Sequence, residues 1–374
     1  MNFDYNEEQQ LLADSVRRFV QKDYDFERRK KILGSADGYS EDVWRTFAEM
    51  GLLALPVSPD YGGFGGGAVD LMAVMEAFGE ALVIEPYLAT IGLGARLVGR
   101  AGSDAQKQAI LPRIAEGKLK LALAHTEKDA RYDLARVAAR ATKSARGWTL
   151  EGEKKIVLGA PCADWLVVSA MSGAGVSLFL VERKAAGVAM KPYRTLDGVR
   201  AADVVLKGVQ VGADALLGRE GEALGAIEEA VDFATALVCA EAVGAMKYAN
   251  EATLEYLKTR KQFGVPIGTF QALQHRVVDM FVAAEQARSM AYLAANTADT
   301  AADAAERMRA ISAAKIRISD ACRHISQESV QLHGGMGMSE EMKVSHTFRR
   351  LTIIAQQFGD ADHHLERFCA LERK

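Results

Sequence analysis

The stretch YLKTRKQFGVPIGTFQALQ, residues 256–274, lies between two long segments in which apolar residues recur every three or four positions. Such spacing is typical of amphipathic helices, so the stretch is predicted to join two of them. Two further segments with the same spacing follow it. The four helices are expected at 222–259, 271–297, 305–332 and 340–371. Helices of this length most simply pack as a four-helix bundle, which we assign to residues 221–374.

The sequence before the bundle changes character once more. Residues 1–120 show helical spacing, interrupted by the glycine-rich run SPDYGGFGGG at 58–67, which predicts an N-terminal helical domain containing one connecting loop. In residues 121–220 short apolar runs alternate with glycine-containing turns, which favours an antiparallel sheet or small barrel. The expected fold is mainly α, with a central antiparallel β-barrel-like domain between two helical domains.

Composition sets several classes of function aside. The formal net charge of the 374 residues is −3, without the broad basic surface that nucleic-acid binding requires. No apolar run approaches the roughly 18 residues of a membrane span. The acidic start MNFDYNEEQQ lacks the features of a signal peptide, so a cytoplasmic protein is expected. The widely spaced cysteines are interpreted as reduced thiols; they are Cys162, Cys239, Cys322 and Cys369.

Two short segments have the chemistry to hold a dinucleotide, although the sequence contains no G-x-G-x-x-G fingerprint and no P-loop. Arg260 can bind a pyrophosphate as a bidentate fork, and Gly334 and Gly335 allow a phosphate to approach their backbone amides. An adenine requires flat apolar faces and an edge partner, which are offered by Phe263, Phe270 and Gln271. Taken alone, Arg260 also fits a solvated arginine at a helix end, and Gly334 and Gly335 fit a glycine helix stop. The two together favour cofactor binding.

Residues 256–274 and the loop QLHGGMGMSEE at 331–341 resemble the acyl-CoA dehydrogenase family in the spacing of arginine, phenylalanine, glycine and glutamine. The N-terminal FDYNEEQ, the loop at 58–67 and GEKKIV from Gly152 fit the same frame. The resemblance implies FAD, held in a dimer of dimers in which residues 260–271 reach a neighbour's flavin. The cofactor-binding residues that it implies are His125, Thr126, Ile156, Leu158, Arg260, Gln262, Phe263, Phe270, Gln271, Gln331, His333, Gly334 and Gly335.

The reaction of the family removes a proton from the α carbon of an acyl-CoA thioester while a hydride leaves the β carbon for the flavin. A carboxylate must act as the base. In the largest branch of the family it lies in a stretch that corresponds to RRLTIIAQQFGDADHHLERF, where this chain has Phe358. In a second branch it lies on the first bundle helix, where this chain has Ala234. Thr235 then replaces an arginine that contacts CoA, although Asp232 matches a family position.

Two carboxylates near these positions are candidates for a relocated base. Asp360 lies two residues beyond Phe358, and Glu241 lies two helical turns beyond Ala234. Each carboxylate also has a structural interpretation, as a C-cap or turn residue for Asp360 and as a partner-paired helix-packing residue for Glu241. The identity of the catalytic base is therefore left unknown by the sequence.

The flavin edge of the β domain departs from the family as well. The stretch HTEKDARYD keeps Thr126 and Glu127 of a Thr-Glu-Pro motif but has Lys128 in place of the proline. On the next strand, residues 156–158 replace a Trp-Ile-Thr. Their backbone can still hydrogen-bond a flavin, whereas the indole and hydroxyl contacts are lost.

Three functions are compatible with this pattern. Retained FAD residues without a base resemble the small subunit of heteromeric acyl-CoA dehydrogenases of the pimeloyl-CoA or steroid side-chain type, in which a larger subunit of the family supplies the base. The first expectation is therefore FAD-dependent desaturation of an acyl-CoA by a heterotetramer, with electron-transfer flavoprotein as acceptor. The alternatives are a self-sufficient acyl-CoA dehydrogenase with a relocated base, and a flavin-dependent oxidase, monooxygenase or scaffold on the same fold.

Overall fold

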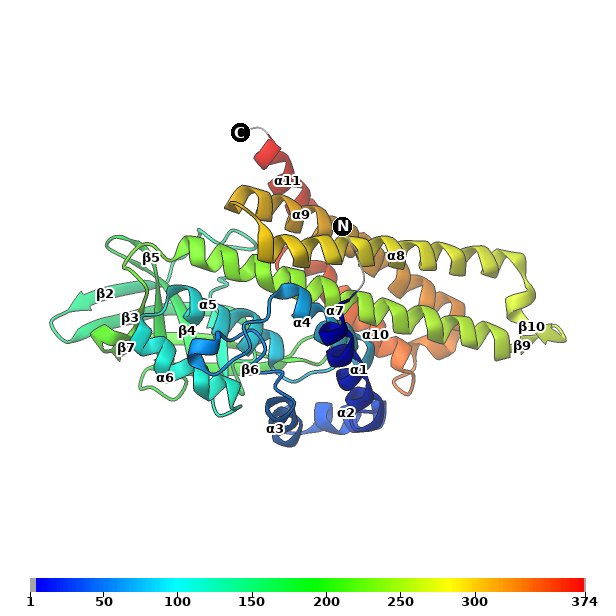
Figure 1. Ribbon diagram of the computed structural model, residues 1–374, viewed down its shortest axis with the longest axis horizontal. Coiled ribbons are helices and arrows are strands. Elements are labelled where there is room, and N and C mark those ends of the chain that lie inside the picture. Colours follow the sequence, from blue (N-terminus) through cyan, green and yellow to red (C-terminus); the bar gives the residue numbers. More distant parts are fainter. Residues whose placement is uncertain (1–4, 373–374) are drawn as a thin grey trace. The chain divides into compact units, whose positions relative to one another are not determined.

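The computed structural model of the chain describes residues 5–372, so the first two residues of FDYNEEQ lie outside it (Figure 1). The described residues form two compact units. The first contains those up to Lys30, Gly67–Val83 and those from Thr235 on; the second contains Lys31–Gly66 and Ile84–Ala234. The segment boundaries expected after residues 120 and 220 stay a prediction. None of the described helices combines the length and the apolar character needed to cross a membrane.

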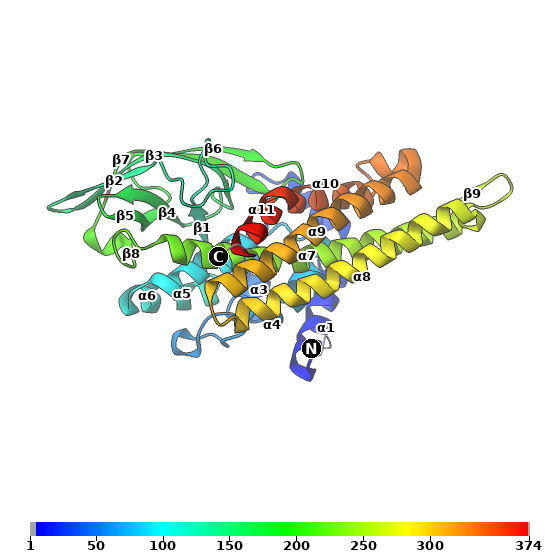
Figure 2. The same cartoon turned by 90° about the horizontal axis from the view of Figure 1, so that it is seen from above.

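The first unit is a helical assembly built around α9 (Ala304–His333). Among the helices that pack on α9 are α8 (Gln271–Thr300), α10 (Lys343–Gln356) and α11 (Ala361–Glu372). α7 (Leu224–Thr259) runs alongside α8, and Figures 1 and 2 both show a hairpin joining their ends. Small buried residues fill the space between α7, α8 and α9; they include Ala236, Ala294 and Ala314. The remaining elements are α1 (Glu7–Lys22), the start of α2 (Phe26–Gly34), α4 (Ala68–Ala81), β9 (Lys261–Gln262), β10 (Val265–Pro266), η4 (Ile267–Thr269) and η5 (Gly334–Met338).

The fourth helix expected at 340–371 is two helices, which corrects the prediction. α10 ends at Gln356 and α11 begins at Ala361, because Phe358 and Gly359 have φ angles of 62° and 124°. A left-handed backbone cannot continue an α-helix. The buried Lys315 on α9 stabilises the break, since its Nζ donates to the carbonyl oxygens of Ile354 at 2.9 Å and Gly359 at 2.8 Å.

The second unit contains an open, mixed sheet. Its strands are ordered β6-β7-β3-β2-β4-β5-β8, and β1 pairs with β4. The expected barrel-like closure is therefore wrong, because β6 and β8 lie at the two ends of the strand order and do not pair with each other. Most pairs are antiparallel, as predicted, but β1 and β2 both run parallel to β4. The fold class, with N-terminal helical, middle sheet and C-terminal helical segments, is confirmed.

The elements of the second unit follow the chain in a simple order. Its strands are β1 (Leu121–Ala124), β2 (Arg140–Ser144), β3 (Gly147–Leu158), β4 (Trp165–Ser172), β5 (Gly175–Glu182), β6 (Val188–Arg194), β7 (Arg200–Val211) and β8 (Leu216–Leu217). Its helical elements are α3 (Glu41–Glu49), η1 (Pro59–Tyr61), η2 (Leu88–Ala95), α5 (Arg96–Ala101), α6 (Asp104–Ala115), η3 (Ala213–Ala215) and the first turns of α7. The sheet has an apolar core that includes Trp148 packed edge-on against Phe179.

Candidate functional site

The segment that begins at Arg260 forms the hairpin that joins the end of α7 to the start of α8. Its ends are held together by a 2.8 Å hydrogen bond from the Ile267 amide to the Arg260 carbonyl. Phe263 has a left-handed φ of 54° and is 91% exposed, and its ring lies 6.1 Å from that of Phe270. Among the described residues, no carboxylate pairs with the Arg260 guanidinium. The hairpin thus presents a cation and two aromatic faces outward, with Gln262 and Gln271 also exposed.

The glycine loop follows α9 directly and also presents open backbone. A side chain at Gly334, where φ is 59°, or at Gly335 would meet no atom within 4 Å. Open space beside two glycine amides fits an approaching phosphate. Gln331, one turn earlier, is exposed as well.

His333 connects the glycine loop to α7 and is used within the fold. Its buried ring stacks on Tyr256 with centroids 4.5 Å apart, and its Nδ1 donates to the Ser329 carbonyl at 2.7 Å. Burial lowers the pKa of His333, so the imidazole is neutral at pH 7. Because Tyr256 lies one turn before Arg260, this stack brings the two predicted segments together. Direct contact of His333 with a cofactor stays a prediction.

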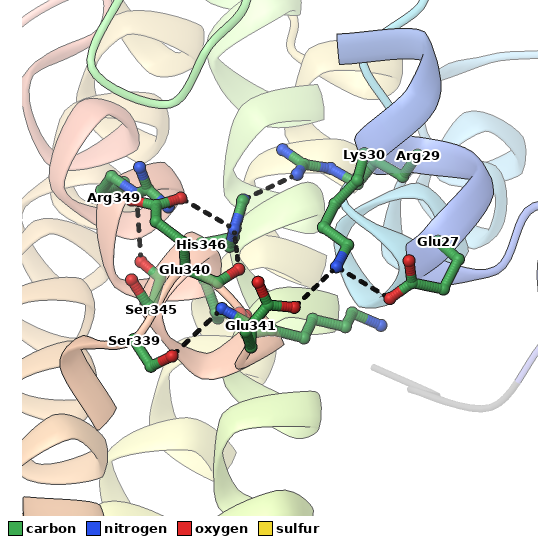
Figure 3. Close-up of polar contacts among 11 residues, drawn as sticks. Glu27, Arg29, Lys30, Ser339, Glu340, Glu341, Ser345, His346 and Arg349 are labelled. Atoms are coloured by element: carbon green, nitrogen blue, oxygen red, sulfur yellow. Dashed lines mark hydrogen bonds and ion pairs between the residues drawn. The ribbon is translucent and has the colours of Figure 1, made fainter. Parts of the chain in front are cut away.

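A polar cluster anchors the chain just after the glycine loop (Figure 3). Arg29 can only donate, so the 3.0 Å contact of its Nη1 makes Nδ1 of His346 an acceptor. Nε2 of His346 then donates to the Glu340 carbonyl at 3.1 Å. The Glu340 carboxylate accepts from Arg349 at 2.9 Å, and Lys30 bonds Glu341 at 3.1 Å. The cluster fixes the start of α10 against α2, and sequence spacing did not reveal it.

The predicted flavin-edge residues are neighbours in the second unit. The Lys155 amide donates to the Thr126 carbonyl at 2.7 Å, which places the segment after β1 beside the end of β3. Thr126 and Ile156 are exposed, and Leu158 is half-buried. His125 instead points inward, with Nδ1 2.8 Å from the Ser169 hydroxyl, and burial lowers its pKa to about 4.

A buried ion pair underlies this edge. Nζ of Lys154, which has no exposed surface, donates to Glu127 at 2.7 Å and to Ser169 at 2.9 Å. Glu127 also accepts the backbone amides of Ala138 and Ala139, so its charge is fully satisfied. Glu127 and Lys154 lie within the motifs HTEKDARYD and GEKKIV, yet their pairing depends on the sheet and was not predicted.

No carboxylate occupies either family position for the base. Phe358 is half-buried in the left-handed turn between α10 and α11, and Ala234 and Thr235 are buried in α7, as is Asp232. Phenylalanine, alanine and threonine cannot serve as the carboxylate base.

Both substitute carboxylates have structural partners. Glu241 accepts a bidentate ion pair from Arg350, with Nε–Oε1 at 2.6 Å and Nη2–Oε2 at 2.7 Å. Their side chains are only 6% and 11% exposed. Asp360 accepts the His363 amide at 2.9 Å and so caps the start of α11, instead of ending a helix. Their use as bases stays a prediction.

These features define a class of protein in which the chain forms helices, then a sheet, then helices again, with open backbone at a glycine loop. Residues 6–118, 122–209 and 223–367 match the models of the N-terminal, middle and C-terminal domains of acyl-CoA dehydrogenases. The chain belongs to the acyl-CoA dehydrogenase family, and is thus an oxidoreductase that uses FAD. When bound, FAD supplies the hydride acceptor.

Three relatives illustrate the range of this similarity. Subunit CarC of the caffeyl-CoA reductase-Etf complex of Acetobacterium woodii is 28% identical over 94% of both chains. The solved Tcur3481-Tcur3483 steroid ACAD is 28% identical, has a TM-score of 0.89, and is matched over 98% of both chains. The FAD complex of PigA is 27% identical, with a TM-score of 0.91 over 99% of this chain and 98% of that one.

Proposed function

We propose that this chain is the base-lacking subunit of a heteromeric FAD-dependent acyl-CoA dehydrogenase, which forms an α,β double bond in an acyl-CoA thioester. One observation carries the proposal: the two family positions for the base are Phe358 and Ala234, and the nearby carboxylates are engaged in the fold. Glu241 is paired with Arg350, and Asp360 caps α11. A subunit of the same family therefore has to supply the proton acceptor.

We assign the FAD contacts from the resemblance of these segments to the family. Thr126 and residues 156–158 would border the flavin ring, and Gly334 and Gly335 would receive the pyrophosphate on their amides. The Arg260 guanidinium would bind the pyrophosphate of a neighbouring subunit's FAD as a bidentate fork. Adenine contacts are assigned to the outward-facing side chains of the hairpin region, Phe263, Phe270 and Gln271.

Exposed apolar side chains support assembly with a second subunit. On α8, Val278, Phe281 and Val282 are 57%, 58% and 46% exposed, at a spacing that places them on one face. Phe263 on the hairpin is 91% exposed. Patches of this kind mark interaction sites. We assign this α8 face to the larger, base-carrying subunit, in a tetramer with two copies of each chain.

Two relatives support this assignment. One is the Tcur3481-Tcur3483 steroid ACAD, and the other is subunit CarC of the caffeyl-CoA reductase-Etf complex. We accordingly infer electron-transfer flavoprotein as the electron acceptor, and we place the reaction in cytoplasmic β-oxidation.

Anaerobic flavin bleaching tests the proposal. The FAD-loaded chain is mixed with straight-chain, dicarboxylic and steroid side-chain acyl-CoAs, alone and after coexpression with a larger subunit of the family. Flavin absorbance should fall only in the coexpressed complex. Bleaching by the chain alone would refute the base-lacking assignment. In that case Glu241→Gln and Asp360→Asn identify which carboxylate acts, because an amide cannot accept the proton.

The α8 face is tested in the same coexpression system. Phe281→Asp should prevent copurification of the larger subunit, because an interface core does not tolerate an unpaired charge. Leu365→Asp is the matched control, since Leu365 is 51% exposed on α11. Equal copurification of both variants would contradict the assigned interface.

A further inference from the structure

The end of β3 contains a strained bulge. Lys154 pairs with Val204 and Val157 pairs with Ala202, so Lys155 and Ile156 together face the single residue Asp203 on β7. Ile156 has a φ of 52° and is 55% exposed. A β-branched side chain disfavours this left-handed conformation, so the surroundings must impose it. Bulges of this kind often re-aim a side chain beside an active site.

Asp203 forms two hydrogen bonds that hold the bulge and a third that orients its own carboxylate. Its Oδ2 accepts from Nζ of Lys155 at 2.9 Å, and its Oδ1 accepts from the Ile156 amide at 3.4 Å. The Tyr193 hydroxyl on β6 donates to Oδ1 at 3.0 Å and so orients the carboxylate. On the other side of the bulge, the Lys155 amide donates to the Thr126 carbonyl at 2.7 Å. The bulge is thus fixed between Asp203 and the segment after β1.

We propose that Asp203 is a positioning residue for FAD, which holds the bulge so that Ile156 and Thr126 present one surface to the flavin ring. The proposal rests on the FAD contacts assigned above to Thr126 and residues 156–158. Asp203 affects FAD binding only by holding the backbone of the bulge. Without its carboxylate, Ile156 would relax to an extended conformation, which would turn the exposed side chain away and move the backbone beside Thr126.

The chain offers a matched control for this role. Glu153 also forms an ion pair with Lys155, but it lies on β3 itself and makes no contact with the Ile156 amide. Glu153→Ala therefore removes a partner of the same lysine without releasing the bulge. Glycine adopts a φ near 52° without strain, so Ile156→Gly provides a suppressor.

Titration of deflavinated protein with FAD tests the proposal. Asp203→Ala should weaken FAD binding about tenfold and shift the visible flavin spectrum, while Glu153→Ala leaves both unchanged. Ile156→Gly should remove most of the further effect of Asp203→Ala, because the two residues act through one backbone conformation. Tyr193→Phe should give a smaller shift of the same sign.

The outcomes separate positioning from general stability. If Asp203→Ala binds FAD like Glu153→Ala and keeps the wild-type spectrum, the proposal is overturned. If Asp203→Ala does not fold, Asp203→Asn and Tyr193→Phe are titrated instead, and wild-type affinity and spectrum in both would overturn it equally. Neither result affects the base-lacking assignment, which is decided by bleaching with acyl-CoA.

Discussion

Glu241 has two possible interpretations, as a catalytic base or as the partner of Arg350. A carboxylate two turns from a family base position suggests catalysis, but both oxygens are occupied by a guanidinium in a pair that is largely buried. Removing one member of a buried pair leaves the other charge uncompensated. We expect Glu241→Gln to lower the free energy of unfolding by about 3 kcal/mol, as measured by urea denaturation.

A double substitution provides the control for this pair. Replacing both residues by methionine, Glu241→Met with Arg350→Met, leaves no unpaired charge and should cost less than Glu241→Met alone. Equal losses in the single and double variants would show that the ion pair does not account for the stability of this contact.

At the scale of elements, two glycines determine how closely α4 and α7 pack. A Cβ at Gly244 would lie 1.8 Å from the Glu76 carbonyl, and one at Gly79 would lie 1.9 Å from the Glu241 carbonyl. Gly244→Ala should therefore force the helices apart and destabilise the protein by about 2 kcal/mol. Gly225, also on α7, has no atom within 4 Å of such a Cβ. Gly225→Ala should stabilise by about 0.5 kcal/mol, as judged by urea denaturation. Equal effects would contradict the close crossing.

Sequence spacing predicted the helical segments well, because apolar residues recur every three or four positions within most of them. It missed the break in the last helix, since the left-handed turn at Phe358 and Gly359 depends on Lys315 from another helix. It also predicted closure of a sheet whose end strands do not pair. Short apolar runs in the sequence identify strands, but they contain little information about whether the two end strands of the sheet pair with each other.

The candidate site likewise contains residues that the sequence indicated and residues that it did not. Arg260 and the glycine loop could be proposed from the sequence because their chemistry is local to short motifs. Asp203 and the pairing of Lys154 with Glu127 were missed, since strand register and the bulge bring their partners together. These residues would look like ordinary strand charges in any one-dimensional pattern.

At the scale of the whole molecule, two histidines that fold in the neutral form make stability depend on pH. Burial lowers the pKa of His364 to about 2 and that of His125 to about 4, whereas an unfolded histidine titrates near 6.5. Because both folded pKa values are depressed, the stability is fully present above about pH 6.5 and is lost as the pH falls. At pH 5 each unfolded histidine binds a proton that the folded one excludes, which costs about 2 kcal/mol per site.

Urea denaturation at pH 7.5 and pH 5 measures this loss, and amide variants separate it from the titration of carboxylates. Gln at position 364 can still reach the Phe358 carbonyl that accepts from His364 Nε2 at 3.2 Å, and Asn at position 125 can still bond Ser169. The double variant His125→Asn with His364→Gln should lose about 4 kcal/mol less than the wild type between the two pH values. An unchanged loss would mean that both imidazoles bind protons equally in the folded and unfolded states, and that the acid sensitivity of the fold lies elsewhere.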